Sequence, residues 1–518
     1  MELKTTYIHM NREKGRALSQ ITLDDDYNLP DYKPDIVKVM KEKGEIQFEE
    51  VKVSEGHILV QGALKFWILY RSDRDEKKLD CLTGSIPFTE TISLEGAEEL
   101  DPVQMSAKVE DLSIEIINSR KLGVRALVML QALIRQSGDE EIATDVVAQQ
   151  PLEMQREQQE VLGLLECKKD NFRFRQEISL PSSKPNIRDI LWKSVQLRGF
   201  ESRLAEGRIE LSGELLVYVL YMGEEDQERM QWIETTLPLT GSLECTGCSP
   251  DLIYRIIARP RTVELEVKPD FDGEMRTLNL DMVLDLDICL WKEETIEILK
   301  DVYSLSGEIV PEYKECSLPR LIAKNYAKCK VTDRIGLQNE QENILQICVC
   351  EGTAALEQVT FEAGGVKAEG TIEVELMYIT TDDAMPVGTL KGLIAFEQKV
   401  EVPGADENSE FEVEAGLEQL EAVLVDNTQV EIKAVVNLNL IAFSNQSMQK
   451  LAAIEEREPN LDELQKSPGI VGYIVKAGDS LWKIAKENHT TISDLMQTNQ
   501  LTAEEIREGD KLLIVKTV

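Results

Sequence analysis

The clearest structural signal in this 518-residue chain is the run Arg208-Ile-Glu-Leu-Ser-Gly-Glu-Leu-Leu-Val-Tyr-Val-Leu-Tyr221. Its apolar residues recur at every second position, the period that puts side chains on one face of a β-strand. They are Ile209, Leu211, Leu215, Val217 and Val219. The opposite face begins with polar side chains and ends with Leu216, Tyr218 and Leu220. We therefore predict a strand that begins half exposed and ends covered on both faces.

The landmarks around this run recur in two other places, which indicates an internal repeat. One copy lies 151 residues earlier, and its matched pairs are Leu29-Pro30 with Leu180-Pro181, Lys33-Pro34-Asp35-Ile36 with Lys184-Pro185-Asn186-Ile187, Gly56 with Gly207, Gly62 with Gly213, Tyr70 with Tyr221, Pro87 with Pro238 and Gly96 with Gly247. A more divergent copy lies 157 residues later; it lacks the Lys-Pro pair and keeps Asn343-Ile344, Gly370, Tyr378 and Gly404.

The repeats predict a multidomain, mainly β chain. Alternation continues in later strands of the unit, such as Val430 to Phe443, so we expect three β-sandwich-like domains. Their expected limits are 21–136, 172–292 and 324–444, after an N-terminal extension at 1–20. The segments 137–171, 293–323 and 445–469 are interpreted as linkers, and the first and last of them, which are charged and rich in glutamine, are expected to be part helical and part flexible. Pro34 suits a first helical turn, so Ile36 to Lys43 is predicted as a short helix.

Charge and cysteine content narrow the class of protein. A formal net charge of -38 argues against binding to nucleic acid or to an anionic membrane surface. No apolar run has the length or flanks of a signal peptide or a transmembrane helix, which predicts a cytosolic protein. Nine scattered cysteines, an odd number, favour reduced thiols in a reducing compartment.

The end of the chain carries a different motif, which includes Tyr473-Ile-Val-Lys-Ala-Gly-Asp-Ser-Leu-Trp482, Thr491-Ile-Ser-Asp494 and Gly509-Asp-Lys-Leu512. Leu481, Ile484 and Ala485 share one face of a predicted helix that Asp479 or Ser480 can cap, and Thr491 with Asp494 resembles a capping box for a second helix. Strands are predicted before and after the helices. In this order and these residues the segment 470–518 resembles the LysM family, which implies a small βααβ domain.

The LysM resemblance implies a shallow groove, formed by two loops, for N-acetylglucosamine-containing glycans such as peptidoglycan or chitin. The residues that it places there are Gly478, Asp479, Ser480, Leu481, Trp482, Asn499, Gln500, Leu501 and Ile506. Leu481, Asn499 and Ile506 can equally be core or turn residues. We expect Asp479, Ser480, Trp482 and Gln500 to be exposed, with Trp482 the preferred binding residue because aromatic side chains dominate interface hot spots. The alternative for Trp482 is a contact that caps the LysM core.

No catalytic, metal or cofactor site is expected. Gly478-Asp479-Ser480-Leu481 matches the nucleophile motif of a serine esterase family, but His489 lacks the Asp-x-x-His context of that family's base. Cys245 and Cys248 form a C-x-x-C, yet no second pair lies at zinc-site spacing, so a turn with two ordinary thiols is expected. The three histidines, His9, His57 and His489, lie in different regions.

The three β-repeats followed by LysM resemble the SPOCS-domain proteins of spore-forming bacteria. That resemblance implies a non-enzymatic scaffold on the mother-cell side of the forespore, which tethers the coat basement layer by docking a SpoIVA-like coat morphogenetic ATPase through LysM. Self-association through the repeats is a further expectation. The alternatives are a peptidoglycan-binding protein of wall or cortex and, less favoured, an enzyme hidden in the β-repeats.

Overall fold

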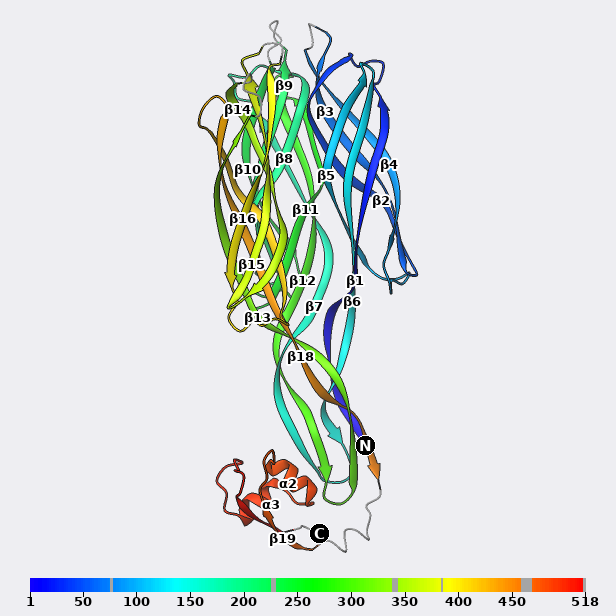
Figure 1. Cartoon of the computed structure of the whole chain (residues 1–518), viewed down its shortest axis with the longest axis vertical. Helices are drawn as coiled ribbons and strands as arrows, with labels where there is room; N and C mark the ends of the chain where they lie inside the picture. Colours follow the sequence, from blue (N-terminus) through cyan, green and yellow to red (C-terminus); the bar gives the residue numbers. More distant parts are fainter. Residues whose placement is uncertain (75–77, 225–229, 338–342, 383–384, 458–467, 516–518) are drawn as a thin grey trace.

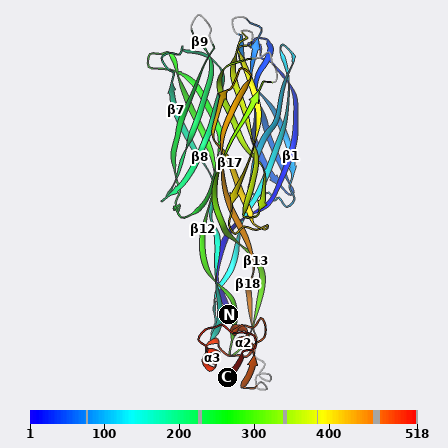
Figure 2. The same cartoon turned by 60° about the vertical axis from the view of Figure 1, so that its left-hand side comes forward.

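The computed structural model describes residues 1–518 except 75–77, 225–229, 338–342, 383–384, 458–467 and 516–518. Figure 1 and Figure 2 show β-sandwiches side by side at one end, a narrow stalk of long strands, and a small helical module at the far end of the stalk. The predicted mainly β fold with a small C-terminal helical module is confirmed.

Each repeat consists of six antiparallel strands in two three-stranded sheets. In the first repeat the strands are β1 (Glu2–Asn28), β2 (Ile36–Ser54), β3 (His57–Ser72), β4 (Leu79–Ser93), β5 (Val103–Asn118) and β6 (Lys121–Val147), paired as β1-β6-β5 and β2-β3-β4. In the second they are β7 (Leu152–Ser179), β8 (Ile187–Ala205), β9 (Arg208–Gly223), β10 (Met230–Glu244), β11 (Ile253–Pro269) and β12 (Met275–Ser304). In the third they are β13 (Glu308–Gly336), β14 (Ile344–Glu362), β15 (Gly365–Thr380), β16 (Val387–Glu401), β17 (Glu410–Leu424) and β18 (Gln429–Arg457).

The two sheets of a repeat face each other across an apolar core. In the first repeat, Phe66 and Ile68 of β3 are fully buried together with Leu130 and Ile134 of β6. The alternating residues of the sequence repeat supply these side chains, because a strand's period of two turns every second residue toward the opposite sheet. The segment 36–43, predicted as a helix, is instead the start of β2, where it pairs with β3. Strand pairing therefore overrides the local helix signal of Pro34.

The repeat motif Lys-Pro followed by a tyrosine 36 residues later closes the open end of the sandwich. The hydroxyl of Tyr70 donates to the carbonyl of Pro34 at 3.2 Å, and Tyr221 donates to Pro185 at the same distance. Lys33 pairs with the buried carboxylate of Asp80 at 3.0 Å. The motif is therefore structural, since it satisfies buried polar groups at the end of the core.

Glycine at position 370 is required by a close approach between strands. A Cβ atom built there would lie 2.6 Å from the ring of Phe396 and closer still to the carbonyl oxygen of Ala355. We expect Gly370→Ala to lower the free energy of unfolding by about 1 to 3 kcal/mol, the usual cost of overpacking. The control is Gly416→Ala, where a Cβ meets no atom within 4 Å. Equal denaturation midpoints for the two variants would contradict this account.

Three long antiparallel ribbons, β1 with β6, β7 with β12 and β13 with β18, leave the sandwiches and form the stalk. Each has an unpaired residue in its first strand where it leaves the sandwich: Lys14, Leu165 and Ile322. Such bulges bend a strand and increase its twist. These three residues are separated by the same 151 and 157 positions as the sequence repeat, so the stalk belongs to the repeated unit.

The prediction of part-helical linkers is wrong, because the segments 137–171, 293–323 and 445–457 lie mostly in these ribbons. The expected extension 1–20 is likewise part of β1. Residues 458–467 of the last expected linker lie outside the described residues. The ribbons pack on one another through apolar side chains, including Ile142, Ile298 and Leu318. Lys450 of β18 also pairs with Glu140 of β6 at 2.5 Å.

The inner sheets of the three sandwiches meet in a common core. Each second strand has a bulge there, and its extra residue, Met40, Leu191 or Cys348, enters this core. Tyr218 and Leu220 of β9 are fully buried in it. This confirms the predicted strand covered on both faces: one face lies in its own sandwich, and the other contacts the neighbouring repeats.

Two cysteine pairs differ from the sequence prediction. Cys167 and Cys289 face each other across β7 and β12 with Cα atoms 4.3 Å apart and are joined by a disulfide. Cys245 and Cys248 are also joined, because the turn at Gly247, with φ of 87°, brings them together. The prediction of reduced thiols is wrong for these four. The other five cysteines are free.

Candidate functional site

The C-terminal module has the predicted order of elements: β19 (Ile470–Ile474), α2 (Leu481–Glu487), α3 (Ile492–Thr498) and β20 (Lys511–Val515). Ser480 caps α2 by accepting a hydrogen bond from the backbone N–H of Lys483 at 3.2 Å. Thr491 caps α3 by accepting from Asp494 at 2.9 Å. Both capping predictions are confirmed, and the caps fix where the two helices begin.

The first candidate loop is held by Asp479. Its carboxylate accepts hydrogen bonds from the backbone N–H of Lys476 at 2.9 Å and from the hydroxyl of Tyr473 at 2.8 Å, and these bonds lower the pKa of Asp479. The side chain is only 4% exposed, so the prediction that Asp479 is exposed is wrong. Gly478 has a φ of +82° and is exposed beside it. Asp479 thus shapes the loop, and Gly478 and Ser480 form its open surface.

The second candidate loop is fixed in the same manner by Asn499. Its side-chain amide donates to the carbonyl oxygens of Leu495 and Leu513, both at 2.8 Å, and accepts from the N–H of Leu513 at 2.7 Å. Gln500 follows with φ of 56° and is exposed. Leu501 and Ile506 are half-buried against the module core, and Leu481 is part of that core. The exposed candidates are therefore Gly478, Ser480 and Gln500.

Trp482 lies against the stalk, not in the solvent. It is 8% exposed, its indole N–H donates to Asp301 of β12 at 2.7 Å, and its ring meets that of Tyr303 edge-on with centroids 4.9 Å apart. Lys486 pairs with Asp301 at 2.6 Å, and the hydroxyl of Tyr303 donates to the carbonyl of Thr490 at 2.8 Å. The prediction of an exposed Trp482 is wrong, because the stalk buries this side chain. Its hydrogen-bond partner Asp301 lies 181 residues away in the sequence.

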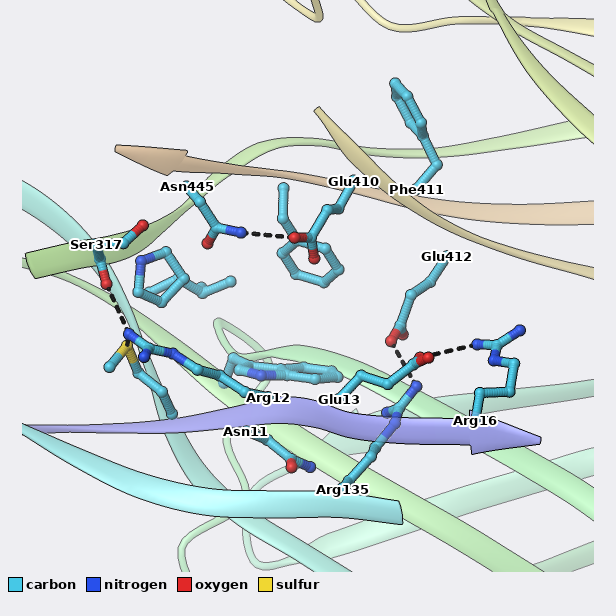
Figure 3. Close-up of a pocket in the computed structure, with 15 residues that line it drawn as sticks. Asn11, Arg12, Glu13, Arg16, Arg135, Ser317, Glu410, Phe411, Glu412 and Asn445 are labelled. Carbon is cyan, nitrogen blue, oxygen red and sulfur yellow. Dashed lines mark hydrogen bonds and ion pairs between the residues drawn. The ribbon is translucent and has the colours of Figure 1, made fainter. Parts of the chain in front are cut away.

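A cavity of about 610 Å³ lies where the three repeats enter the stalk (Figure 3). The charged side chains that line it have partners within the chain: Glu412 pairs with Arg135 at 2.9 Å and, outside the lining, with Arg255 at 2.6 Å, and Arg16 pairs with Glu13 at 2.9 Å. Arg12 donates to the carbonyl of Ser317 at 3.1 Å, and Glu410 accepts from the side-chain amide of Asn445 at 2.6 Å. Arg135, Arg255 and Glu412 come from different repeats. We interpret this cavity as a structural junction, since its charged side chains are already engaged by other groups of the chain.

Over the described part of the chain, no group of three or more His, Cys, Asp or Glu side chains is placed to hold a metal ion. None of the helices there has the length and hydropathy to cross a membrane.

Comparison with known families identifies the parts of the chain. The family model described as "SipL, SPOCS domain" matches residues 35–117, 186–268 and 343–425, one match in each sandwich. The LysM domain model matches residues 473–515. Both are non-catalytic domain families. No curated protein and no solved structure gives a match.

Proposed function

Because the chain is a SipL-like protein with three SPOCS domains and a C-terminal LysM domain, we propose that it is a non-enzymatic scaffold of the spore coat. It docks a SpoIVA-like coat basement protein at the forespore surface, on the mother-cell side, through LysM. The observation that carries the proposal is the position of LysM at the end of the stalk, away from the sandwiches, with Gly478, Ser480 and Gln500 exposed.

The packing of the three sandwiches and the stalk supports the proposal of a scaffold, because it makes them one rigid unit. Interlocked ribbons, bulges at equivalent places and a core shared by three repeats hold the sandwiches as one body. Such a body sets a fixed distance between a partner bound to the sandwiches and the end of the stalk on which LysM lies. Self-association through the sandwiches is part of this proposal.

The test compares the full chain with Gly478→Asn for binding to a SpoIVA-type protein and, in parallel, to peptidoglycan and chitin oligomers. Asparagine tolerates the positive φ of Gly478, and a Cβ there meets no atom within 4 Å, so the change adds bulk to the loop without disturbing the fold. We expect at least about a tenfold loss of affinity for the protein partner, or about 1.4 kcal/mol. Gly472→Asn, exposed in β19 with equally open surroundings, is the control.

The second candidate is glycan binding, which the LysM match itself favours. It predicts that purified peptidoglycan binds the chain, that Gly478→Asn abolishes this binding, and that the SpoIVA-type protein does not bind. That outcome would refute the scaffold proposal.

A further inference from the structure

We propose that the surface formed by Trp482 and Lys486 of α2 and by the backbone carbonyl of Thr490, which follows α2, is a docking surface for an extended protein segment with an acidic residue two positions before a tyrosine. The chain's own stalk occupies this surface with Asp301-Val302-Tyr303, and a partner segment of the same pattern competes for it. The inference deepens the proposed function, on which it rests for the identity of the partner as a protein.

The occupied surface shows what it recognises. The carboxylate of Asp301 lies between two donors of the LysM face, the indole N–H of Trp482 at 2.7 Å and the ammonium of Lys486 at 2.6 Å. Two residues along the strand, on the same side, Tyr303 places its ring edge-on to Trp482 and its hydroxyl on the carbonyl of Thr490. An acid and an aromatic phenol at this spacing engage the indole N–H of Trp482, the ammonium of Lys486 and the carbonyl of Thr490. Within the stalk, Asp301 also accepts a hydrogen bond from the hydroxyl of Tyr313 at 2.8 Å.

A β-bulge in the stalk positions Asp301 and Tyr303. Lys300 is an unpaired bulge residue immediately before Asp301, and bulges re-aim the following side chains. The other two ribbons have bulges at the same place, Thr144 and Ala452. Their residues corresponding to Asp301 and Tyr303 are Asp145 with Val147, and Ala453 with Glu455. Among the three ribbons, the ribbon of the second repeat alone has both the acidic residue and the tyrosine at these positions.

The contact is of a kind that can exchange. It rests on a handful of side chains, and the LysM groove residues Gly478, Ser480 and Gln500 take no part in it. Because the stalk residues are part of the same chain, their effective concentration at the LysM face is high. A segment of another molecule must therefore compete with Asp301 and Tyr303 of the chain itself. The apparent affinity for a competitor equals its intrinsic affinity multiplied by the fraction of molecules in which the face is open.

The test uses the peptide EILKDVYSLSG, which is residues 297–307, with a fluorescent label. Its binding is measured by fluorescence anisotropy with the full wild-type chain and with the double variant Asp301→Asn, Tyr303→Ala. In the double variant the stalk has lost the two side chains that occupy the LysM face. We expect the double variant to bind the peptide at least about tenfold more tightly. Adding Trp482→Ala to it should abolish binding, and the peptide with Asp→Asn and Tyr→Ala should not bind.

The inference would be overturned if the peptide bound the wild type and the double variant equally, or if binding persisted after Trp482→Ala. It would also be overturned if the peptide failed to bind a double variant whose melting temperature is unchanged. If the double variant melts early, Tyr303→Phe is the host, because it keeps the ring and removes only the hydrogen bond to Thr490; a gain of about threefold is then expected. The assay contains no SpoIVA-type protein, so it can fail while the proposed function stands. A partner that uses the groove alone would bind wild type and double variant equally.

Discussion

Replacing Lys41 with methionine should lower the free energy of unfolding by about 3 to 5 kcal/mol, the usual effect of breaking a buried ion pair. The Lys41 side chain is 1% exposed in the core shared by the three sandwiches. Its ammonium lies 2.5 Å from Glu375 and 3.6 Å from Glu351, both of the third repeat, and over the ring of Trp192 of the second. Methionine fills most of the space but leaves two carboxylates without their cation.

Urea denaturation followed by circular dichroism measures this effect. The matched control is Lys52→Met on the same strand, whose ion pair with Glu50 is exposed and should contribute less than about 1 kcal/mol. Adding Glu375→Gln to Lys41→Met should recover part of the loss, since it removes one orphaned charge. A loss no greater than that of Lys52→Met would show that water reaches the site and screens it.

The sandwiches were predictable from sequence because their signal is local and repeated. Strands such as β9 bury alternate residues in their own sandwich, so the period of two is visible in the chain itself. The repeated Gly207 and Gly247 mark turns with φ of 70° and 87°, which glycine adopts without strain. The same kind of landmark residues located the divergent third repeat, which the family comparison then matched.

The stalk was not predictable in this way because its strands bury few residues. In the stalk part of β7, Val161 and Leu162 are buried while most neighbouring side chains are charged or amide groups in contact with water. Such a sequence resembles a linker. Its strand state depends on pairing with β12, more than 100 residues away along the chain, and β-structure depends on such context more than helices do.

The candidate site shows the same difference between features set by local sequence and features set by distant contacts. Capping of the two helices follows from local spacing, so the sequence predicted Thr491 and, with Asp479 as the other candidate, Ser480. Leu481, predicted for the groove with a core role as the alternative, is a core residue. The burial of Trp482 depends on Asp301 and Tyr303 of a different domain. Local patterns carry no information on such a contact. The pair of residues at the stalk tip would have stood out only by aligning the tips of the three ribbons, once the bulges are known.

Replacing Glu414 with glutamine should stabilise the protein at pH 8 by about 1 to 3 kcal/mol and have little effect at pH 4.5. Glu414 lies on β17, between the second and third sandwiches, and burial raises its pKa to about 7, although Arg255 and Arg259 oppose the shift. The carboxyl therefore holds its proton longer in the folded chain than in the unfolded one, where the pKa is about 4.3. Stability must then fall as the pH rises from about 4.5 to 7, and the penalty is complete above pH 7.

Glutamine keeps the shape of the protonated carboxyl and cannot ionise, so the variant should lose this part of the pH dependence. Thermal or urea unfolding at a series of pH values measures it. Glu421→Gln, exposed on the same strand, provides the control and should leave the profile of the wild type unchanged. If Glu414→Gln instead shows the wild-type profile, the carboxylate is ionised and paired with Arg255 or Arg259 in the folded chain. The contact between the second and third sandwiches would then be stabilised by charge at neutral pH, and acid would weaken it.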